Sequence, residues 1–240
     1  LDRAARLVET WFVDPATAMV PDARFAQHEP GRPGWANPAG WIDFRDFWLL
    51  PALCRSLVIG RALPLPSRDA ARAWAGRLND ALTGTRQGRL AHRSRNNIGT
   101  WMHLLQASLG LWLGRYKDAS RLFGLAPVRL AMQCGPDGAQ ALELDRKRPL
   151  HYSLFNITAW ALLAGLARSN RVDLWRYRGV EGQSICRMLG YVIGKRDDFA
   201  EAQTQPEHWA AWIDALCLLV PEDAADRDLL PSRRNQGNRT

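Results

Sequence analysis

Hydrophobic positions recur at helical spacing along most of the chain. Trp101, Leu105, Leu109 and Trp112 fall on one stripe of a helix expected over residues 97–113. The same spacing predicts further helices over residues 1–12, 41–61, 67–82, 118–134, 152–167, 182–193 and 207–219. No strand pair or hairpin signal accompanies them. The pattern therefore predicts an all-α protein.

Glycine, proline and polar residues mark where these helices end. A short turn at residues 135–138 contrasts with a long irregular stretch at residues 13–40. We expect Ser67 to cap the helix that it begins and Pro51 to interrupt the helical pattern around it. Short turns alternating with long loops favour stacked antiparallel helical hairpins, as in an α/α toroid.

Composition and charge narrow the class of protein and of partner. The chain has 240 residues, of which 47% are hydrophobic and 23% charged, so it can bury a large core. We expect one domain over residues 1–220 and a charged tail over residues 221–240. The net charge of +8 favours an anionic partner: nucleic acid, an anionic membrane surface or an acidic polysaccharide. The basic residues are scattered, without a nucleic-acid-binding motif, so nucleic acid is the weaker expectation.

Two further classes of feature are not expected. No apolar run approaches the roughly 20 residues that cross a bilayer, so membrane insertion is not expected. The four cysteines show neither a CxxC motif nor Cys/His ligand spacing, so a metal site is not expected. Their even number allows disulfides, but apolar surroundings favour small buried thiols. These cysteines are Cys54, Cys134, Cys186 and Cys217.

A first polar island interrupts the apolar pattern at residues 95–101, where Asn96 and Asn97 precede a predicted helix. Asparagine is a good N-cap, which explains one of the two. A second asparagine and Trp101 exceed what a cap needs. The island is therefore a candidate site.

A second polar island covers residues 143–153, with Asn156 one helical turn beyond it. Tyr152 and Asn156 are four residues apart, so their side chains share one face of a helix. Glu143 and Asp145 lack the arrangement of paired carboxylates that glycoside hydrolysis uses, and we expect them to support the neighbouring arginines.

Three blocks of sequence, in this order, resemble the alginate lyase superfamily of polysaccharide lyases. Residues 11–19 resemble its WFxDPxTxM segment, which Pro21 completes. Residues 96–101 resemble its Asn-Asn-His-Gly-Thr-Trp signature. Asp137-Gly138 and residues 143–156 resemble its DG and ELxRxRxxxYSxxN stretch. The resemblance spans roughly residues 7 to 195 and implies an α/α toroid. Because family members commonly have further helices before this segment, we expect an incomplete barrel of antiparallel hairpins, with part of the toroid absent at the N-terminal end.

The resemblance implies cleavage of an acidic polysaccharide by β-elimination. The C5 proton of a 4-linked uronate leaves while O4 departs, and the adjacent carboxylate must be neutralised because its charge opposes carbanion formation. Asparagine amides and arginine guanidinium groups can donate to that carboxylate, and Asn97 and Arg146 are the candidates. Tyr152 would act as base and acid, and nearby positive charge is needed because a tyrosine has a reference pKa near 10. No organic cofactor is needed. The substrate-binding residues would be Asn96, Trp101, Gln106, Arg148 and Asn156.

One position departs from the family pattern. Ile98 stands where the family has His, and isoleucine can neither neutralise a carboxylate nor act as a base. His151 is the best substitute by proximity to Tyr152, and His103 is a second candidate. Two hypotheses follow: a lyase acting on alginate or glucuronan, and a non-catalytic relative that binds a uronate polymer.

Closeness to loops also suggests that Trp35, Trp41 and Trp101 line a sugar-binding groove. Core packing is the equal or better interpretation for Trp48, Trp74, Trp112 and Trp160. The resemblance implies a periplasmic or secreted location, although the chain shows no signal peptide.

Overall fold

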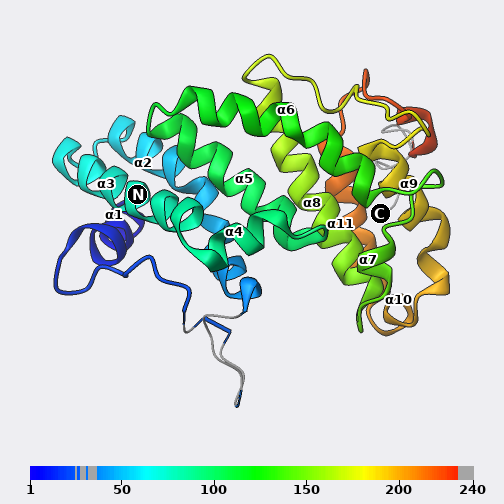
Figure 1. The fold of residues 1–240 in the computed structure, drawn as a ribbon, viewed down its shortest axis with the longest axis horizontal. Coiled ribbons are helices and arrows are strands. Elements are labelled where there is room, and N and C mark those ends of the chain that lie inside the picture. The colour runs from blue at the N-terminus through cyan, green and yellow to red at the C-terminus, as the bar shows by residue number, and fades with distance from the viewer. Residues whose placement is uncertain (25, 28–30, 32–36, 232–240) are drawn as a thin grey trace. The chain divides into compact units, whose positions relative to one another are not determined.

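The computed structural model describes residues 1–24, 26, 27, 31 and 37–231, and these residues form helices and loops without a strand. The all-α prediction is confirmed (Figure 1). The helices fall into two compact units. Unit 1 holds Leu1–Ser94 and Trp101–Leu122, and unit 2 holds Arg95–Thr100 and the chain from Phe123 onward. The single domain predicted over residues 1–220 stays a prediction.

Unit 1 is built around helix α3. Its elements are α1 (Asp2–Val8), a π-helical turn (Glu9–Val13), a 3₁₀ helix (Pro38–Leu49), α2 (Leu50–Ile59), α3 (Leu65–Gly84), α4 (Arg86–Arg93), and the parts of α5 (Asn97–Trp112) and α6 (Tyr116–Gln133) that lie in residues 101–122. Helix α3 contacts α2, α4 and the π-helical turn. Trp74 of α3 lies at the centre, with Phe12 and Phe47 edge-on to its ring at centroid distances of 4.7 and 5.2 Å. These aromatic contacts join the N-terminal segment to α3.

Unit 2 is built around helix α8. Its further elements are the part of α6 from Phe123, α7 (Ala141–Leu144), α8 (Pro149–Arg168), α9 (Ile185–Lys195), α10 (Ala200–Thr204), α11 (Pro206–Leu219) and 3₁₀ turns at Arg196–Asp198 and Arg227–Leu229. Helices α7, α9, α10 and α11 all contact α8. Most of α8 is therefore buried, including Leu154, Trp160 and Leu163.

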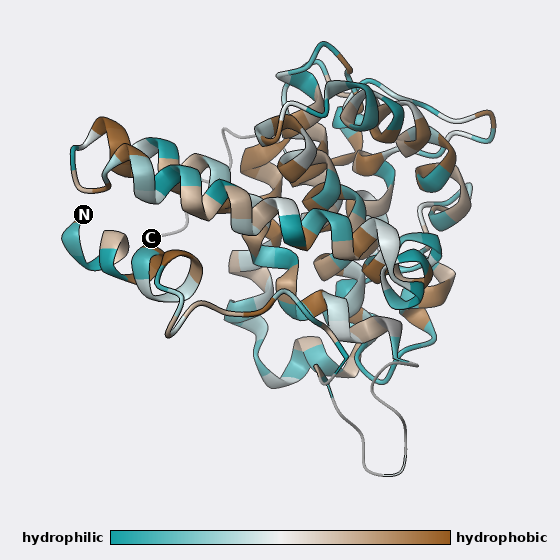
Figure 2. Cartoon of the chain, turned by 60° about the vertical axis from the view of Figure 1, so that its left-hand side comes forward, coloured by the Kyte–Doolittle hydropathy of each residue, from teal (hydrophilic) through white to brown (hydrophobic). Residues whose placement is uncertain are grey.

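Helix α8 alone, among the described residues, has the length and apolar composition to cross a membrane. Because His151, Tyr152 and Asn156 interrupt its apolar pattern, this helix does not show as an unbroken apolar run in the sequence. Of its most apolar window, 61% is buried inside the protein, as expected of a core helix. Hydropathy colouring shows hydrophobic and hydrophilic residues alternating along the helices, the pattern of amphipathic packing (Figure 2).

Two predicted helix starts need correction. Residues 41–49 belong to a 3₁₀ helix, and α2 begins only at Leu50, because Pro51 lacks an N–H and fits the first turn of a helix. The cap predicted at Ser67 is wrong. Helix α3 already begins at Leu65, after an extended Pro64, and has no side-chain cap.

Helix α4 is absent from the sequence prediction. Its sequence, Arg-Gln-Gly-Arg-Leu-Ala-His-Arg, has too few apolar residues to form a clear stripe. Its start signal is local: the Thr85 hydroxyl accepts a hydrogen bond from the Gly88 N–H at 3.1 Å. The short helices α7 and α10 were also missed.

Residues 221–231, the described part of the predicted tail, pack within unit 2. Ala224 and Leu230 are buried. Asp226 accepts a hydrogen bond from the Ser184 hydroxyl at 2.6 Å and pairs with Arg178 and Arg187. Ser184 in turn caps α9. Residues 232–240 lie outside the described residues.

The prediction of buried thiols is confirmed, since all four cysteines are buried and free. Burial raises the pKa of Cys54 and of Cys134 to about 11 and that of Cys186 to about 12. Thiols with such values stay protonated at neutral pH and are poor nucleophiles.

Candidate active site

The start of α5 is held by a buried carboxylate from α7. Glu143 accepts hydrogen bonds from the backbone N–H of Asn97 at 2.6 Å and from its Nδ2 at 2.7 Å. Asn97 is 3% exposed and Glu143 1% exposed. Glu143 thus acts as an N-cap of α5, because it accepts a hydrogen bond from a backbone N–H of the first turn, although it lies 46 residues away in sequence. Its hydrogen-bond partner is Asn97, whereas the sequence led us to expect an arginine.

Burial raises the pKa of Glu143, while the two hydrogen bonds from Asn97 and the charge of Arg146 act in the opposite direction. The cost of desolvating a carboxylate is the largest of these effects. The pair therefore joins one buried acid to one buried amide, with a cation close by.

Tyr152 lies in the first turn of α8 and is half-buried. The guanidinium carbon of Arg146 lies 4.3 Å from the centroid of its ring, a close cation–π contact. Arg146 is exposed, and the described residues offer its guanidinium no carboxylate within ion-pair distance and no hydrogen-bond acceptor. Its N–H groups are therefore available to an anionic ligand.

The structure thus brings four residues of unit 2 into one connected set: Asn97, Glu143, Arg146 and Tyr152. Asn97 is hydrogen-bonded to Glu143, and the Arg146 backbone N–H donates to the Glu143 carbonyl at 3.2 Å. Arg146 in turn covers the ring of Tyr152. We call these four residues the Tyr152 cluster.

Behind the cluster lies a network of buried amides centred on Gln133. Its Oε1 accepts hydrogen bonds from Thr100 Oγ1 at 3.0 Å, Asn156 Nδ2 at 3.0 Å and Trp160 Nε1 at 2.9 Å. Its Nε2 donates to the Asn96 carbonyl at 3.1 Å. The network connects the start of α5 to α8 within unit 2. Asn156 is fully buried within this network, and its contact with substrate stays a prediction.

Arg148 is held at the start of α8. Its Nε lies 3.5 Å from Oε1 of Glu201, and the other oxygen of Glu201 accepts a hydrogen bond from the Leu150 N–H at 2.9 Å. The carboxylate therefore lies at the positive end of α8, where an anion is stabilised. Substrate binding by Arg148 and Asn96 stays a prediction.

His151 and His103 differ in environment. The His151 ring lies perpendicular to that of Tyr152 at a centroid distance of 5.2 Å, in unit 2. Burial and the charge of Arg148 lower the pKa of His151, so the ring is neutral at pH 7. His103 belongs to unit 1, is buried, and its Nε2 lies 2.6 Å from the Leu122 carbonyl. That contact is typical of a satisfied core histidine.

Three residues expected near sugar belong to unit 1. Trp101 is buried, with Arg45 5.9 Å from its ring centroid. Trp41 is buried against Phe44 and borders a second pocket of unit 1, and its expected place in a sugar-binding groove stays a prediction. Gln106 lines a pocket in unit 1. Trp35 lies outside the described residues.

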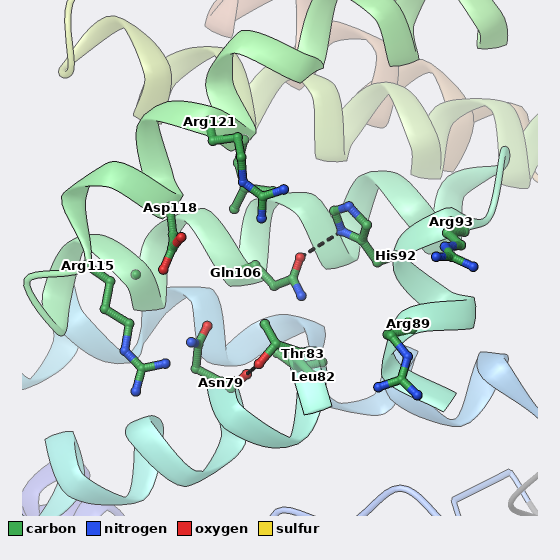
Figure 3. A pocket seen from close by; sticks show the side chains of 12 residues that line it. Asn79, Leu82, Thr83, Arg89, His92, Arg93, Gln106, Arg115, Asp118 and Arg121 are labelled. Atoms are coloured by element: carbon green, nitrogen blue, oxygen red, sulfur yellow. Dashed lines mark hydrogen bonds between the residues drawn. The ribbon is translucent and has the colours of Figure 1, made fainter. Parts of the chain in front are cut away.

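That pocket measures about 450 Å³ and is lined by residues of α3, α4, α5 and α6 (Figure 3). Apart from Gln106, sequence reasoning missed its polar lining. The signal in the sequence was the spacing of Arg89 and Arg93, four residues apart on a helix that was itself missed. In the described part of the chain, no three His, Cys, Asp or Glu side chains gather as metal ligands.

Comparison with known proteins agrees with this geometry. The family model for alginate lyase matches residues 1–202. The chain belongs to the alginate lyase family. A crystal structure of an alginate lyase from Bacteroides ovatus matches with a TM-score of 0.80 at 22% identity, covering 91% of this chain and 58% of that one. This likeness confirms the predicted α/α toroid fold. Because the match covers 58% of the Bacteroides ovatus lyase, the chain spans little more than half the length of that protein. A search of curated proteins found no significant match.

Proposed function

We propose that this member of the alginate lyase family cleaves a 4-linked uronate polymer, of the alginate or glucuronan type, by β-elimination. The contact between Arg146 and Tyr152 carries the proposal. The guanidinium lies 4.3 Å from the ring centroid, so the cation that can neutralise a uronate carboxylate and the phenol that can exchange protons with the sugar lie side by side.

Arg146 can serve the substrate as well as the tyrosine. A guanidinium stacks through its face and donates hydrogen bonds from its edge, so covering the ring leaves N–H groups for a carboxylate. In the proposed mechanism these groups neutralise the uronate as charge develops at C5. Tyr152 then takes the C5 proton and returns a proton to the departing O4.

Asn97 is proposed as the second donor to the carboxylate. An amide has two N–H donors, and one of them is used by Glu143. That bond fixes the orientation of the amide, so the second donor is already aligned when substrate binds.

The alternative function is that of a non-catalytic binder of uronate polymers, and it rests on Ile98. A neutral His151 beside Tyr152 can accept a proton but cannot offset the charge of a carboxylate. If a second positive charge is indispensable, the chain binds without cutting.

The test is a panel of purified polymannuronate, polyguluronate and glucuronan, assayed for unsaturated, ultraviolet-absorbing ends. We expect at least one polymer to be cut, and Tyr152→Phe to lower kcat at least about a hundredfold with binding nearly unchanged, since only a hydroxyl is lost. Tyr191→Phe, a half-buried tyrosine of α9, is the matched control and should keep activity. Polymer binding without new double bonds would select the alternative function.

Partner and location follow from the same proposal. The net charge of +8 favours encounter with a polyanion, so an acidic polysaccharide is the proposed partner, in preference to nucleic acid. A periplasmic or secreted location is proposed because the resemblance to the alginate lyase family implies it.

A further inference from the structure

The pocket of unit 1 is lined mainly by basic and amide side chains. Arg89, His92 and Arg93 reach it from α4, and Arg115, Asp118 and Arg121 reach it from the start of α6 and the residue before it (Figure 3). Four arginines against one aspartate make it a positively charged site. Its volume of about 450 Å³ lies within the range of small-molecule sites.

Two of these arginines have no partner within the part of the chain that the structure describes. Arg115 pairs with Asp80 at 2.6 Å, and Arg89 donates to the Gly84 carbonyl at 2.6 Å. Arg93 and Arg121 make no hydrogen bond or ion pair with any described residue. Two guanidinium groups thus line one pocket without an ion-pair partner among the described residues.

The floor of the pocket holds amides that are buried but incompletely bonded. Asn79 is 5% exposed, and its side-chain amide has no hydrogen-bond partner among the described residues. Gln106 is 7% exposed, and its Oε1 lies 2.8 Å from Nδ1 of His92, which leaves the Gln106 amino group toward the pocket (Figure 3). The amide groups that lack a partner among the described residues are open to the pocket, so this floor is suited to a polar ligand.

We propose that this pocket binds a uronate unit, with Arg93 and Arg121 on its carboxylate and Asn79, Thr83 and Gln106 on its hydroxyls. Guanidinium groups match the planar carboxylate, whereas amides and a hydroxyl, which both donate and accept, match sugar hydroxyls. The choice of a uronate rests on the proposed function. The site shares no residue with the Tyr152 cluster, so binding at the pocket can be tested apart from cleavage.

The test is calorimetric titration with mannuronate and glucuronate monosaccharides, which have no glycosidic bond to eliminate. We expect the wild type to bind at least one of them and not to bind mannose, which lacks the carboxylate. Arg93→Gln combined with Arg121→Gln should weaken binding at least about tenfold, because two charge-assisted hydrogen bonds are lost. Arg77→Gln, an exposed α3 arginine outside the pocket, is the matched control and should bind as the wild type does.

A second variant decides the matter if the double variant does not fold. Asn79→Asp keeps the shape of the side chain but places a negative charge on the floor of the pocket, so it should abolish uronate binding. Unchanged affinity in folded double and Asn79→Asp variants would overturn the assignment. Inorganic phosphate binding as tightly as the uronates, and competing with them, would overturn the choice of a sugar acid.

These outcomes are distinct from those that test the proposed function. Polymers left uncut, with uronate binding that depends on Arg93 and Arg121, would overturn the lyase activity and support the pocket. Polymers cut normally, with uronate binding unchanged by loss of both arginines, would support the lyase activity and overturn the pocket assignment.

Discussion

The ring of Tyr152 is covered by Arg146, which lies six positions earlier in the loop between α7 and α8. The guanidinium carbon of Arg146 is 4.3 Å from the ring centroid. The motif in the sequence named both residues, because the family pattern fixes their types. It could not show that Arg146 lacks a carboxylate partner in the described residues while Arg148 is paired to Glu201, since that depends on where α10 packs.

Replacing Arg146 tests the contact directly. Arg146→Gln removes both the cation above the ring and the proposed donor to the uronate, so kcat should fall at least about a hundredfold. Lys147→Gln removes an equal charge from the adjacent exposed position and should change kcat less than about threefold. Steady-state rates of double-bond formation measure both variants. Equal losses in the two would show that only the overall charge of the loop matters.

Ile98, which stands where the family has histidine, tests whether a missing imidazole limits the reaction. It is half-buried, and its backbone N–H donates to Oδ1 of Asn96 at 3.2 Å, a bond that a change of side chain leaves in place. If the missing imidazole limits turnover, Ile98→His should raise kcat about tenfold or more. Ile98→Asn, polar but unable to carry charge, is the comparison. A fall in activity with histidine would mean that the site is shaped around the apolar side chain.

At the scale of elements, helices with long apolar stripes could be predicted from the sequence, whereas a mostly polar helix could not. The stripes of α5 and α8 fixed both helices to within about three residues. Helix α4 was missed because its residues are mostly polar and its neighbours supply the packing. The cap of α5 by Glu143 was equally unpredictable, because an acid 46 residues away becomes a cap only after α7 has docked.

Stability as a function of pH tests this cap. The pKa of Glu143 is raised in the folded state, so the unfolded chain ionises first as the pH rises. The wild type should therefore lose free energy of unfolding between the ordinary glutamate value, near 4.5, and the raised folded value. Glu143→Gln cannot ionise and should lack this component of the pH dependence. Denaturant unfolding at pH 4.5 and pH 7 measures it, with Asp145→Asn as control. Parallel pH profiles for wild type and Glu143→Gln would contradict the assignment.

At the scale of the whole molecule, the net charge of +8 is spread over many helices, with no single basic block in the sequence. Folding concentrates part of that charge, since α4, α6 and the residue before α6 bring four arginines to one pocket. The Tyr152 cluster could be named from motifs because its chemistry restricts residue types. The pocket could not be named, because arginine is common on exposed helix faces and only packing distinguishes a lining residue from a solvated one.

Binding of the polymer should therefore depend strongly on ionic strength. Exposed charges are screened beyond a Debye length of about 8 Å in physiological salt and about 3 Å at 1 M, whereas hydrogen bonds to sugar hydroxyls are affected little. Raising sodium chloride from about 50 mM to 500 mM should weaken polyuronate binding at least tenfold, mainly through slower association. Surface plasmon resonance with immobilised polymer separates the two rates. The Arg93→Gln and Arg121→Gln double variant should show a shallower dependence on salt than Arg77→Gln, which removes one exposed charge elsewhere. Identical salt dependence in the double variant and in Arg77→Gln would show that the long-range attraction comes from the overall charge of the molecule and that the pocket does not contribute to it.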